Sequence, residues 1–395
     1  CGGRGTGAVS QIFNTGEGVE LVAMADAFMD KVKGRADGFK NNKRYKDKMK
    51  VTDDTMFAGF DAYKKAIDAG PDVVVLATPP GFRPMHLEYA VSKGKHVFME
   101  KPVAVDAPGV RSVLESARKA KEQNTLIQVG LQRRHEEKYQ KVIASLQDGA
   151  IGEINYMRAW WNGGGVWVRD RRGLEAKKGA PLTEMEYQMR NWYYFNWLCG
   201  DHITEQHIHN LDVINWLKND YPIEANGQGG RQVRNGIDHG EIYDHHFVEY
   251  TYADGSKMYS QCRHIKGCMN GVFETAHGSK GYCRIGQGEF YDAKGEPLNR
   301  IQGRGGGHQQ EQTNMIDNLR KGNIVNEGEY GAKSSMTSVL GRMATYSGKN
   351  IKWKDAINSK IDLMPKDLSW DANPPAMPDE NGRYPIPMPG KTKAY

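Results

Sequence analysis

A length of 395 residues corresponds to two or three domains of about 150 residues each. Charged residues make up 26% of the chain and hydrophobic residues 38%, which is typical of a globular but polar protein. The longest aliphatic stretch, residues 73–77, is far shorter than the about 20 residues that a membrane helix needs, so we expect no membrane span. Much of the basic excess behind the net charge of +6 lies in residues 31–50. We interpret this stretch as a solvated helix face and loop, and expect no nucleic-acid partner.

The cysteines are few and odd in number, and their spacing matches neither a disulfide framework nor a zinc ribbon. We therefore expect buried free thiols rather than cross-links. The residues concerned are Cys1, Cys199, Cys262, Cys268 and Cys283.

The first residues have the spacing of a nucleotide-binding turn. Gly3, Gly5 and Ala8 fit the pattern G-x-G-x-x-[GA], and a second register uses Gly2 and Gly5. A glycine-rich turn that opens a helix lets the backbone approach a pyrophosphate closely. Because such a turn follows a β-strand, we expect the chain to lack its natural first strand, together with any signal peptide.

An acidic residue follows this turn at the distance expected for a ribose-binding acid. Residues 20–25 read as a strand, and Asp26 comes directly after it, 21 residues beyond Gly5. A carboxylate at this place accepts hydrogen bonds from the ribose hydroxyls and repels a 2′-phosphate, which favours NAD over NADP. The alternative is an ordinary aspartate in a turn at the end of a strand.

Strands and helices alternate as far as residue 130. Apolar β-runs and amphipathic stretches succeed one another at residues 72–77, 84–92, 95–99, 108–123 and 125–130. This order predicts an α/β fold with a doubly wound parallel sheet, that is, a Rossmann domain. We place this NAD-binding domain at residues 1–130.

The pattern changes after residue 130. We expect helices at 135–147, 201–217, 309–321 and 333–348, a strand at 153–161, an irregular stretch at 162–190, and several strands with hairpin turns at 223–290. A mostly antiparallel open sheet follows from this reading. We therefore predict a substrate-binding and oligomerisation α/β domain at 131–370 and an extended, proline-rich tail at 371–395.

Two short motifs lie at the carboxyl ends of predicted parallel strands, where α/β proteins bind ligands. Thr78-Pro79-Pro80 follows the strand at 72–77, and the segment GKHVFMEKP ends in Glu100-Lys101-Pro102. With the glycine turn and Asp26, these motifs resemble the Gfo/Idh/MocA oxidoreductases, over nearly the whole chain. The resemblance implies that the proline peptide is often cis and that Lys101 lies beside the nicotinamide. It also implies cofactor contacts from Gly2, Gly3, Arg4, Gly5, Asp26, Thr78, Pro79, Glu100, Lys101 and Gln132.

Two places depart from the pattern of that family. Pro80 and Arg83 stand where the family has asparagine and histidine, and Gln132-Arg133-Arg134 replaces an Asn-x-Arg. Gln132 retains an amide that can bind the cofactor, and Arg134 takes the place of the arginine near the substrate. A structural salt bridge is the alternative role for Arg134.

A second constellation lies in the segment GDHITEQHIHNLD. His202, Glu205, His209 and Asp212 are spaced 3, 4 and 3 residues apart and would share one face of the predicted helix 201–217. The family pattern is Asp-x-x-x-His-x-x-Asp, in which Glu205 replaces the first aspartate. The resemblance thus implies His209 as general base, with Glu205 and Asp212 toward the substrate; a structural acid is the alternative for Asp212. A metal is not expected, because the four side chains spread over about 15 Å of helix.

These features predict an NAD-dependent oxidoreductase that acts on CH–OH groups of a sugar, sugar derivative or cyclitol. The catalytic residues would be Lys101, His209 and Glu205, and the substrate contacts Lys101, Arg134, Glu205, His209 and Asp212. Two alternatives remain: an NAD-dependent enzyme that cleaves glycosides through transient ring oxidation, and a non-catalytic protein that binds NAD and sugar. The resemblance also implies a homodimer or homotetramer and favours periplasmic location by twin-arginine export, with the cytoplasm as alternative.

Overall fold

The computed structural model describes residues 1–395, which form two compact units. Unit 1 comprises residues 1–103, 111–135 and 305–332, and unit 2 comprises residues 104–110, 136–304 and 333–395. Residues 305–332 therefore pack within unit 1, although they lie far along the chain from the rest of it. The domain limits predicted near residues 130 and 370 stay predictions. No helix is both long enough and apolar enough to cross a membrane.

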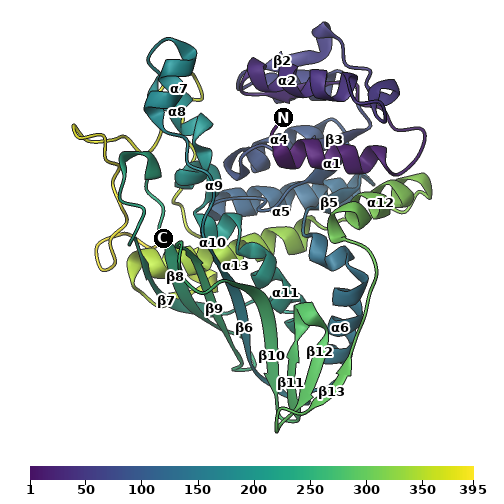
Figure 1. Cartoon of the computed structure of the whole chain (residues 1–395), viewed down its shortest axis with the longest axis vertical. Helices are drawn as coiled ribbons and strands as arrows, with labels where there is room; N and C mark the ends of the chain where they lie inside the picture. The colour runs from purple at the N-terminus through teal and green to yellow at the C-terminus, as the bar shows by residue number, and fades with distance from the viewer. The chain divides into compact units, whose positions relative to one another are not determined.

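Unit 1 is built from parallel strands and helices, as predicted (Figure 1). Strand β1 (Met24–Asp26) pairs with β2 (Met56–Ala58), while β3 (Val73–Leu76), β4 (His96–Met99) and β5 (Ile127–Val129) form a second parallel sheet in that order. The helices are α1 (Gly3–Phe13), α2 (Met29–Lys40), α3 (Ala62–Asp68), α4 (Arg83–Ser92), the larger part of α5 (Ala107–Glu122) and α12 (Gly307–Arg320). This is the Rossmann-like arrangement that the alternating pattern predicts.

In the basic stretch at residues 31–50, the apolar and aromatic side chains pack into the core of unit 1. Helix α2 turns Val32, Ala36 and Phe39 into the core, at intervals of about one turn. The Phe39 and Tyr45 rings pack on Phe13 with centroids 5.6 and 5.4 Å away. The aromatic residues of this stretch therefore face the core, and its lysines and arginines lie mostly at the surface.

Unit 2 contains a nine-stranded sheet in the order β13-β12-β11-β10-β6-β9-β8-β7-β14 (Figure 1). Adjacent strands of this sheet are antiparallel, except for β6 and β9, which are parallel. Gly255, with φ at +83°, turns the chain between β8 and β9, as the Asp-Gly signal predicts. The strands are β6 (Ile154–Gly163), β7 (Glu224–Gly230), β8 (His245–Thr251), β9 (Lys257–His264), β10 (Gly271–Gly278), β11 (Gly281–Arg284), β12 (Glu289–Asp292), β13 (Pro297–Arg300) and β14 (Ile351–Lys352).

One face of this sheet is buried. Side chains alternate along β9, where Met258, Ser260, Cys262 and His264 are buried and the residues between them are half exposed. Helix α11 packs against β6 and β10 on the buried side. The helices of unit 2 are α6 (Glu137–Gln147), α7 (Arg171–Lys178), α8 (Glu184–Arg190), α9 (Asn196–Cys199), α10 (His202–Glu205), α11 (Ile208–Lys218), α14 (Trp353–Ile357) and the larger part of α13 (Gly328–Ser347).

Two predicted elements are wrong. The helix expected over 201–217 is broken at Gln206–His207 into α10 and α11, because the buried His207 ring bonds Ser260 Oγ on β9 at 2.8 Å. The stretch expected to be irregular, 162–190, contains α7 and α8. Their starts are capped by Asp170, which accepts from Gly173 N–H, and by Thr183, which accepts from Glu186 N–H.

The tail from residue 371 contains no helix or strand and is held by scattered bonds. Tyr384 is 6% exposed, the Tyr243 hydroxyl donates to Pro387 O at 2.8 Å, and Gly390 N–H donates to Ser347 O at 2.8 Å. The cysteines are free thiols, as expected, and Cys199, Cys262 and Cys283 are buried. Cys1 is only half-buried and Cys268 is exposed, so the expectation of burial is wrong for these two.

Candidate functional site

The glycine turn leaves backbone exposed where a ligand can approach. Gly2 caps α1, and a Cβ atom on Gly2 or Gly3 would meet no atom within 4 Å. A Cβ on Gly5 would lie 3.1 Å from the Ala77 side chain, just after β3, so α1 approaches the sheet closely at this glycine. The turn thus combines open amides with close helix–strand packing, as a pyrophosphate site requires.

Asp26 lies at the carboxyl end of β1, as predicted. Its carboxylate accepts a hydrogen bond from Phe28 N–H at 3.1 Å, which fixes the side chain at the strand end. The Cys1 thiol lies 3.5 Å from Ala25 O, so the residue before the glycines is next to the residue before Asp26. Unit 1 therefore places Asp26 beside the glycine turn.

An ion pair joins the glycine turn to the Glu-Lys-Pro motif. Glu100 follows β4 and is 3% exposed, and its Oε1 lies 2.8 Å from Arg4 Nε in the first turn of α1. A Cβ on Gly130 would lie 2.7 Å from Glu100 Oε2, so only glycine fits beside this carboxylate. The peptide bond between Lys101 and Pro102 is cis, as the resemblance implies. Unit 1 thus holds the residue before Lys101 against the turn that would receive the cofactor.

Sequence reasoning missed a second buried acid next to this pair. Glu311 on α12 is fully buried, and burial together with the Glu100 charge raises the pKa of its carboxyl well above the ordinary range. The Arg4 charge acts in the opposite direction. Glu311 is separated from Glu100 by more than 200 residues, so no local spacing could reveal it.

Arg83, which stands where the family has histidine, has a structural role in this chain. It is 1% exposed, and its guanidinium donates to Thr78 O at 2.7 Å, Leu76 O at 3.2 Å and Pro102 O at 3.4 Å. It therefore links the Thr-Pro-Pro turn to the Glu-Lys-Pro motif. His86 bonds Thr78 Oγ1 at 3.2 Å and is stacked on Tyr63; burial lowers the pKa of His86 to about 3, so it is neutral.

Gln132 and Arg134 lie in a 3₁₀ turn, Gln132–His135, that follows β5. Gln132 Oε1 is buried without a hydrogen-bond partner, which fits an amide that awaits a ligand. The Arg134 guanidinium stacks over the Tyr330 ring at 4.0 Å. This stacking holds the guanidinium in place, while its contact with a substrate stays a prediction.

Unit 2 carries the acid and histidine of the second constellation. Glu205 ends α10, and His209 lies in the first turn of α11, 7% exposed and stacked on Trp161 of β6 at 6.0 Å. Asp212 accepts from Ser334 Oγ at 2.7 Å and is 1% exposed, which favours its structural role. The expectation that His202, Glu205, His209 and Asp212 share one helical face is wrong, because the helix breaks between Glu205 and His209.

A buried charge network surrounds Asp201, just before α10. Its carboxylate accepts from His202 N and Nδ1, Tyr243 N and Tyr346 Oη at 2.5, 2.7, 2.9 and 2.5 Å. Burial opposes the charge, but His246, 3.2 Å away, and His202 hold the pKa of Asp201 well below its usual range. Burial lowers the pKa of His202 to about 4.

Asp201, His202 and His246 have ligand atoms within 4.8 Å of one another, the spacing of a metal site. The Asp201 oxygens, however, already accept four hydrogen bonds. A metal would have to displace these donors from a fully buried carboxylate. The donor set therefore fits a hydrogen-bonded network better than a metal centre.

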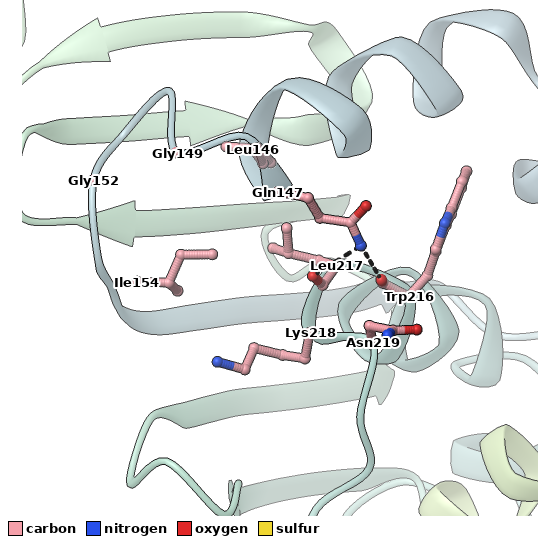
Figure 2. Close-up of a pocket in the computed structure, with 9 residues that line it drawn as sticks. All are labelled: Leu146, Gln147, Gly149, Gly152, Ile154, Trp216, Leu217, Lys218 and Asn219. Atoms are coloured by element: carbon pink, nitrogen blue, oxygen red, sulfur yellow. Dashed lines mark hydrogen bonds between the residues drawn. The ribbon is translucent and has the colours of Figure 1, made fainter.

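A separate cavity of about 650 Å³ lies among the ends of α6 and α11 and the start of β6 (Figure 2). Gln147 spans it, donating to Trp216 O at 2.8 Å and Leu217 O at 3.2 Å. Lys218 is paired with Asp254. None of the predicted site residues lines this cavity, whose walls are Leu146, Gln147, Gly149, Gly152, Ile154, Trp216, Leu217, Lys218 and Asn219.

The parallel sheets, the glycine turn and the acid after β1 define a dinucleotide-binding Rossmann domain. Residues 1–131 match the model of the Gfo/Idh/MocA oxidoreductases, described as an oxidoreductase family with an NAD-binding Rossmann fold. The N-terminal third of the chain is therefore similar to this family, whose Rossmann fold is described as NAD-binding.

Relatives that match part of the chain include inositol dehydrogenases. The chain is 31% identical over 140 residues to inositol 2-dehydrogenase of Klebsiella pneumoniae, covering 35% of this chain and 33% of that one. It is 28% identical over 204 residues to the Serratia proteamaculans enzyme of the same name, covering 49% and 51%. The chain thus spans about a third to a half of the length of these relatives.

Solved structures share the fold along most of the chain. Myo-inositol 2-dehydrogenase from Lactobacillus plantarum matches with a TM-score of 0.63 at 20% identity, over 89% of this chain and 96% of that one. Aldose-aldose oxidoreductase from Caulobacter crescentus matches with a TM-score of 0.65 at 16% identity, over 86% and 93%. At these identities the matches establish the fold.

The place of Asp26 predicts the cofactor choice. The bound cofactor is expected to be NAD(H), because the 2′-phosphate of NADP(H) would be repelled by the Asp26 carboxylate. Asp26→Ser removes that repulsion and should therefore reduce the preference for NAD over NADP. Extraction of the cofactor and mass spectrometry identify it, and titration with both cofactors measures the preference. Asp54→Ser, at an exposed aspartate, is the control. Recovery of NADP at high occupancy from the natural chain would contradict the prediction.

Proposed function

We propose that the protein is an NAD-dependent oxidoreductase that transfers a hydride between nicotinamide and a hydroxyl-bearing carbon of a sugar, sugar derivative or cyclitol. The Arg4–Glu100 ion pair carries this proposal, because it holds the segment that bears Lys101 against the glycine turn of the cofactor site. The names of the relatives, inositol 2-dehydrogenases, support a polyhydroxylated substrate.

The residues of the cofactor site fit a dinucleotide. Gly2 and Gly3 offer open backbone amides, Asp26 offers a carboxylate for the ribose, and Gln132 offers a buried amide oxygen without a partner. NAD, when bound, supplies the acceptor for the hydride. The protein supplies proton transfer and the orientation of the substrate.

His209 is the proposed general base. An imidazole whose unperturbed pKa is about 6.5 can accept a hydroxyl proton at neutral pH. Stacking on Trp161 fixes the plane of the ring. Lys101 is proposed to hold the substrate oxygen and to favour its developing negative charge, and Glu205 to bind a neighbouring hydroxyl or tune Lys101. Arg134 completes the proposed set of substrate residues, while the buried Asp212, bonded to Ser334, is proposed as a structural acid.

Substitution tests these roles. His209→Gln should leave folding and NAD binding intact and lower kcat by on the order of 10²–10⁴, because the proton acceptor is lost. Lys101→Met should lower kcat similarly and also shift the pH profile, since the variant loses the positive charge proposed to hold the substrate oxygen. The controls are His245→Gln and Lys95→Met, at residues outside the proposed site. Full activity in either site variant would assign the base or the oxygen contact elsewhere.

The fate of the hydride separates the dehydrogenase from a glycoside-cleaving enzyme. The protein is incubated with an aryl glycoside and with the matching free sugar, and NADH absorbance and aglycone release are followed together. We expect the free sugar to reduce bound NAD, and no aglycone to leave the glycoside, because no leaving-group acid is assigned in the structure. Aglycone release without net NADH would favour transient oxidation and cleavage. NAD binding without reaction on any sugar would favour a non-catalytic protein.

The open face of the nine-stranded sheet supports a homodimer, with a homotetramer as the alternative. Aromatic residues line it in register: Tyr156 stacks on His277 at 4.4 Å, and Trp160 packs on Phe273 at 4.7 Å. Phe247, 45% exposed, adds an apolar side chain of β8. A second copy of this face would cover these rings.

Light scattering on the whole protein tests this assembly. The natural chain should behave as a dimer, and Phe247→Glu should dissociate it, because a charge would be buried between the two faces. Val233→Glu, at a similarly exposed residue outside the strands, should leave the dimer intact. A natural chain that is monomeric at micromolar concentration would contradict the proposal. For location we propose the periplasm, on the resemblance of the motifs alone.

A further inference from the structure

Three aromatic side chains of unit 2, here called the aromatic cluster, gather outside the residues assigned to catalysis. They are Trp167, Trp192 and Tyr193. The Trp167 ring lies 5.9 Å from that of Trp192 and 6.2 Å from that of Tyr193, with interplanar angles of 66° and 67°. Trp192 and Tyr193 are 5.5 Å apart. Trp167 is 39% exposed, whereas Tyr193 is 3% exposed, so the cluster leads from the surface into the interior.

The outer end of the cluster is held in place, although it has no regular secondary structure. Arg169 N–H donates to Asn191 Oδ1 at 2.9 Å, and Arg171 N–H donates to Asp238 Oδ1 at 3.0 Å, both shortly after Trp167. The Arg169 guanidinium lies 5.1 Å from the centre of the Trp167 ring. Trp167 is therefore a fixed, exposed ring next to hydrogen-bond donors. Because the ring is already held in place, little conformational entropy would be lost when a ligand binds to it.

The inner end of the cluster has an unsatisfied polar group. The Tyr193 hydroxyl is buried and has no hydrogen-bond partner, which is rare for a buried side chain. Its ring is stacked on that of His264 at 6.2 Å. Burial raises the pKa of Tyr193 well above its ordinary value, and the charge of Glu205 adds to this effect. The His264 ring in turn lies 4.5 Å from that of His202, the first residue of α10, and Glu205 is the last residue of that helix. Tyr193 therefore belongs to a group of packed rings that reaches the start of α10.

We propose that the aromatic cluster is a second saccharide subsite, so that the substrate is a glycoside or disaccharide rather than a single sugar ring. One ring would react near Glu205 and His209, and the next would lie on Trp167. This inference rests on the proposed function and names its substrate class.

The chemistry of the cluster matches a sugar. The C–H face of a pyranose packs on an aromatic ring, while its hydroxyls need donors and acceptors at the rim. Arg169 supplies donors beside Trp167. A single sugar held at Glu205 leaves Trp167 without a ligand, which explains why a larger substrate is favoured.

Kinetics on paired substrates test the subsite. The probes are glucose and galactose, each compared with its 4-nitrophenyl glycosides and with cellobiose or lactose. Trp167→Ala should lower kcat/KM for the glycosides and disaccharides roughly 10-fold, because one aromatic–sugar contact is lost, and should leave kcat/KM for the free sugars unchanged. Trp167→Phe, which keeps a ring, should restore most of the loss. Trp353→Ala, at a half-buried tryptophan on α14, is the matched control.

Calorimetric titration of the NAD-loaded protein with the same probes separates the subsite from the proposed reaction. Glycoside binding that depends on Trp167, without any hydride transfer, would support the subsite and overturn the dehydrogenase. Hydride transfer from free sugars and glycosides with equal kcat/KM, unchanged in Trp167→Ala, would overturn the subsite and leave the dehydrogenase standing. Absence of both binding and turnover for every probe would overturn both.

Discussion

A buried carboxylate, Asp201, organises the part of unit 2 that leads into α10 and Glu205. Its backbone has a φ of +70°, a conformation that costs a residue other than glycine on the order of 1–3 kcal/mol. Hydrogen bonds from Tyr243 N and Tyr346 Oη tie the carboxylate to the segment before β8 and to α13, and so hold the chain in this conformation. The direction in which α10 begins is therefore set by a buried charge and its donors. Removal of any one donor would leave this charge less satisfied in a dry interior.

In unit 1, too, a buried carboxylate holds a segment of the chain in place, but here two buried acids lie near one cation. Glu100 and Glu311 are both buried, and Arg4 supplies the cation that faces Glu100. Burial and the Glu100 charge raise the pKa of the Glu311 carboxyl and so favour its protonated form, while the Arg4 charge acts in the opposite direction. The ion pair then fixes the segment before Lys101, whose own charge a catalytic role requires. In both units, burial makes a charged side chain an effective positioning group, because its partners cannot exchange with water.

The two parts of the site differ in how far the sequence predicted them. The glycine turn and Asp26 were recognisable because a dinucleotide is bound by backbone amides and strand ends, and both need local motifs. The broken helix was not, because His207 leaves the helical pattern to bond Ser260, far along the chain. Glu311 was missed for the same reason, and α7 and α8 because the glycines and charges before them are typical of a loop. Local periodicity thus predicts elements, while buried polar contacts between distant segments decide where the elements end.

Cofactor binding and substrate recognition depend on different features of the chain. Cofactor binding requires few backbone conformations, so its motifs persist in recognisable form, and residues 1–131 are the part that matches the family. Substrate recognition depends on side chains brought together by tertiary contacts, and the segment from Trp167 to Tyr193 has the freedom to vary because it lies outside the sheet. Bonds such as Arg169 N–H to Asn191 Oδ1 fix the residues that flank α7 and α8 in that segment. Under the proposed function, a substitution in this segment would therefore change the substrate that is bound without altering the glycine turn of the cofactor site.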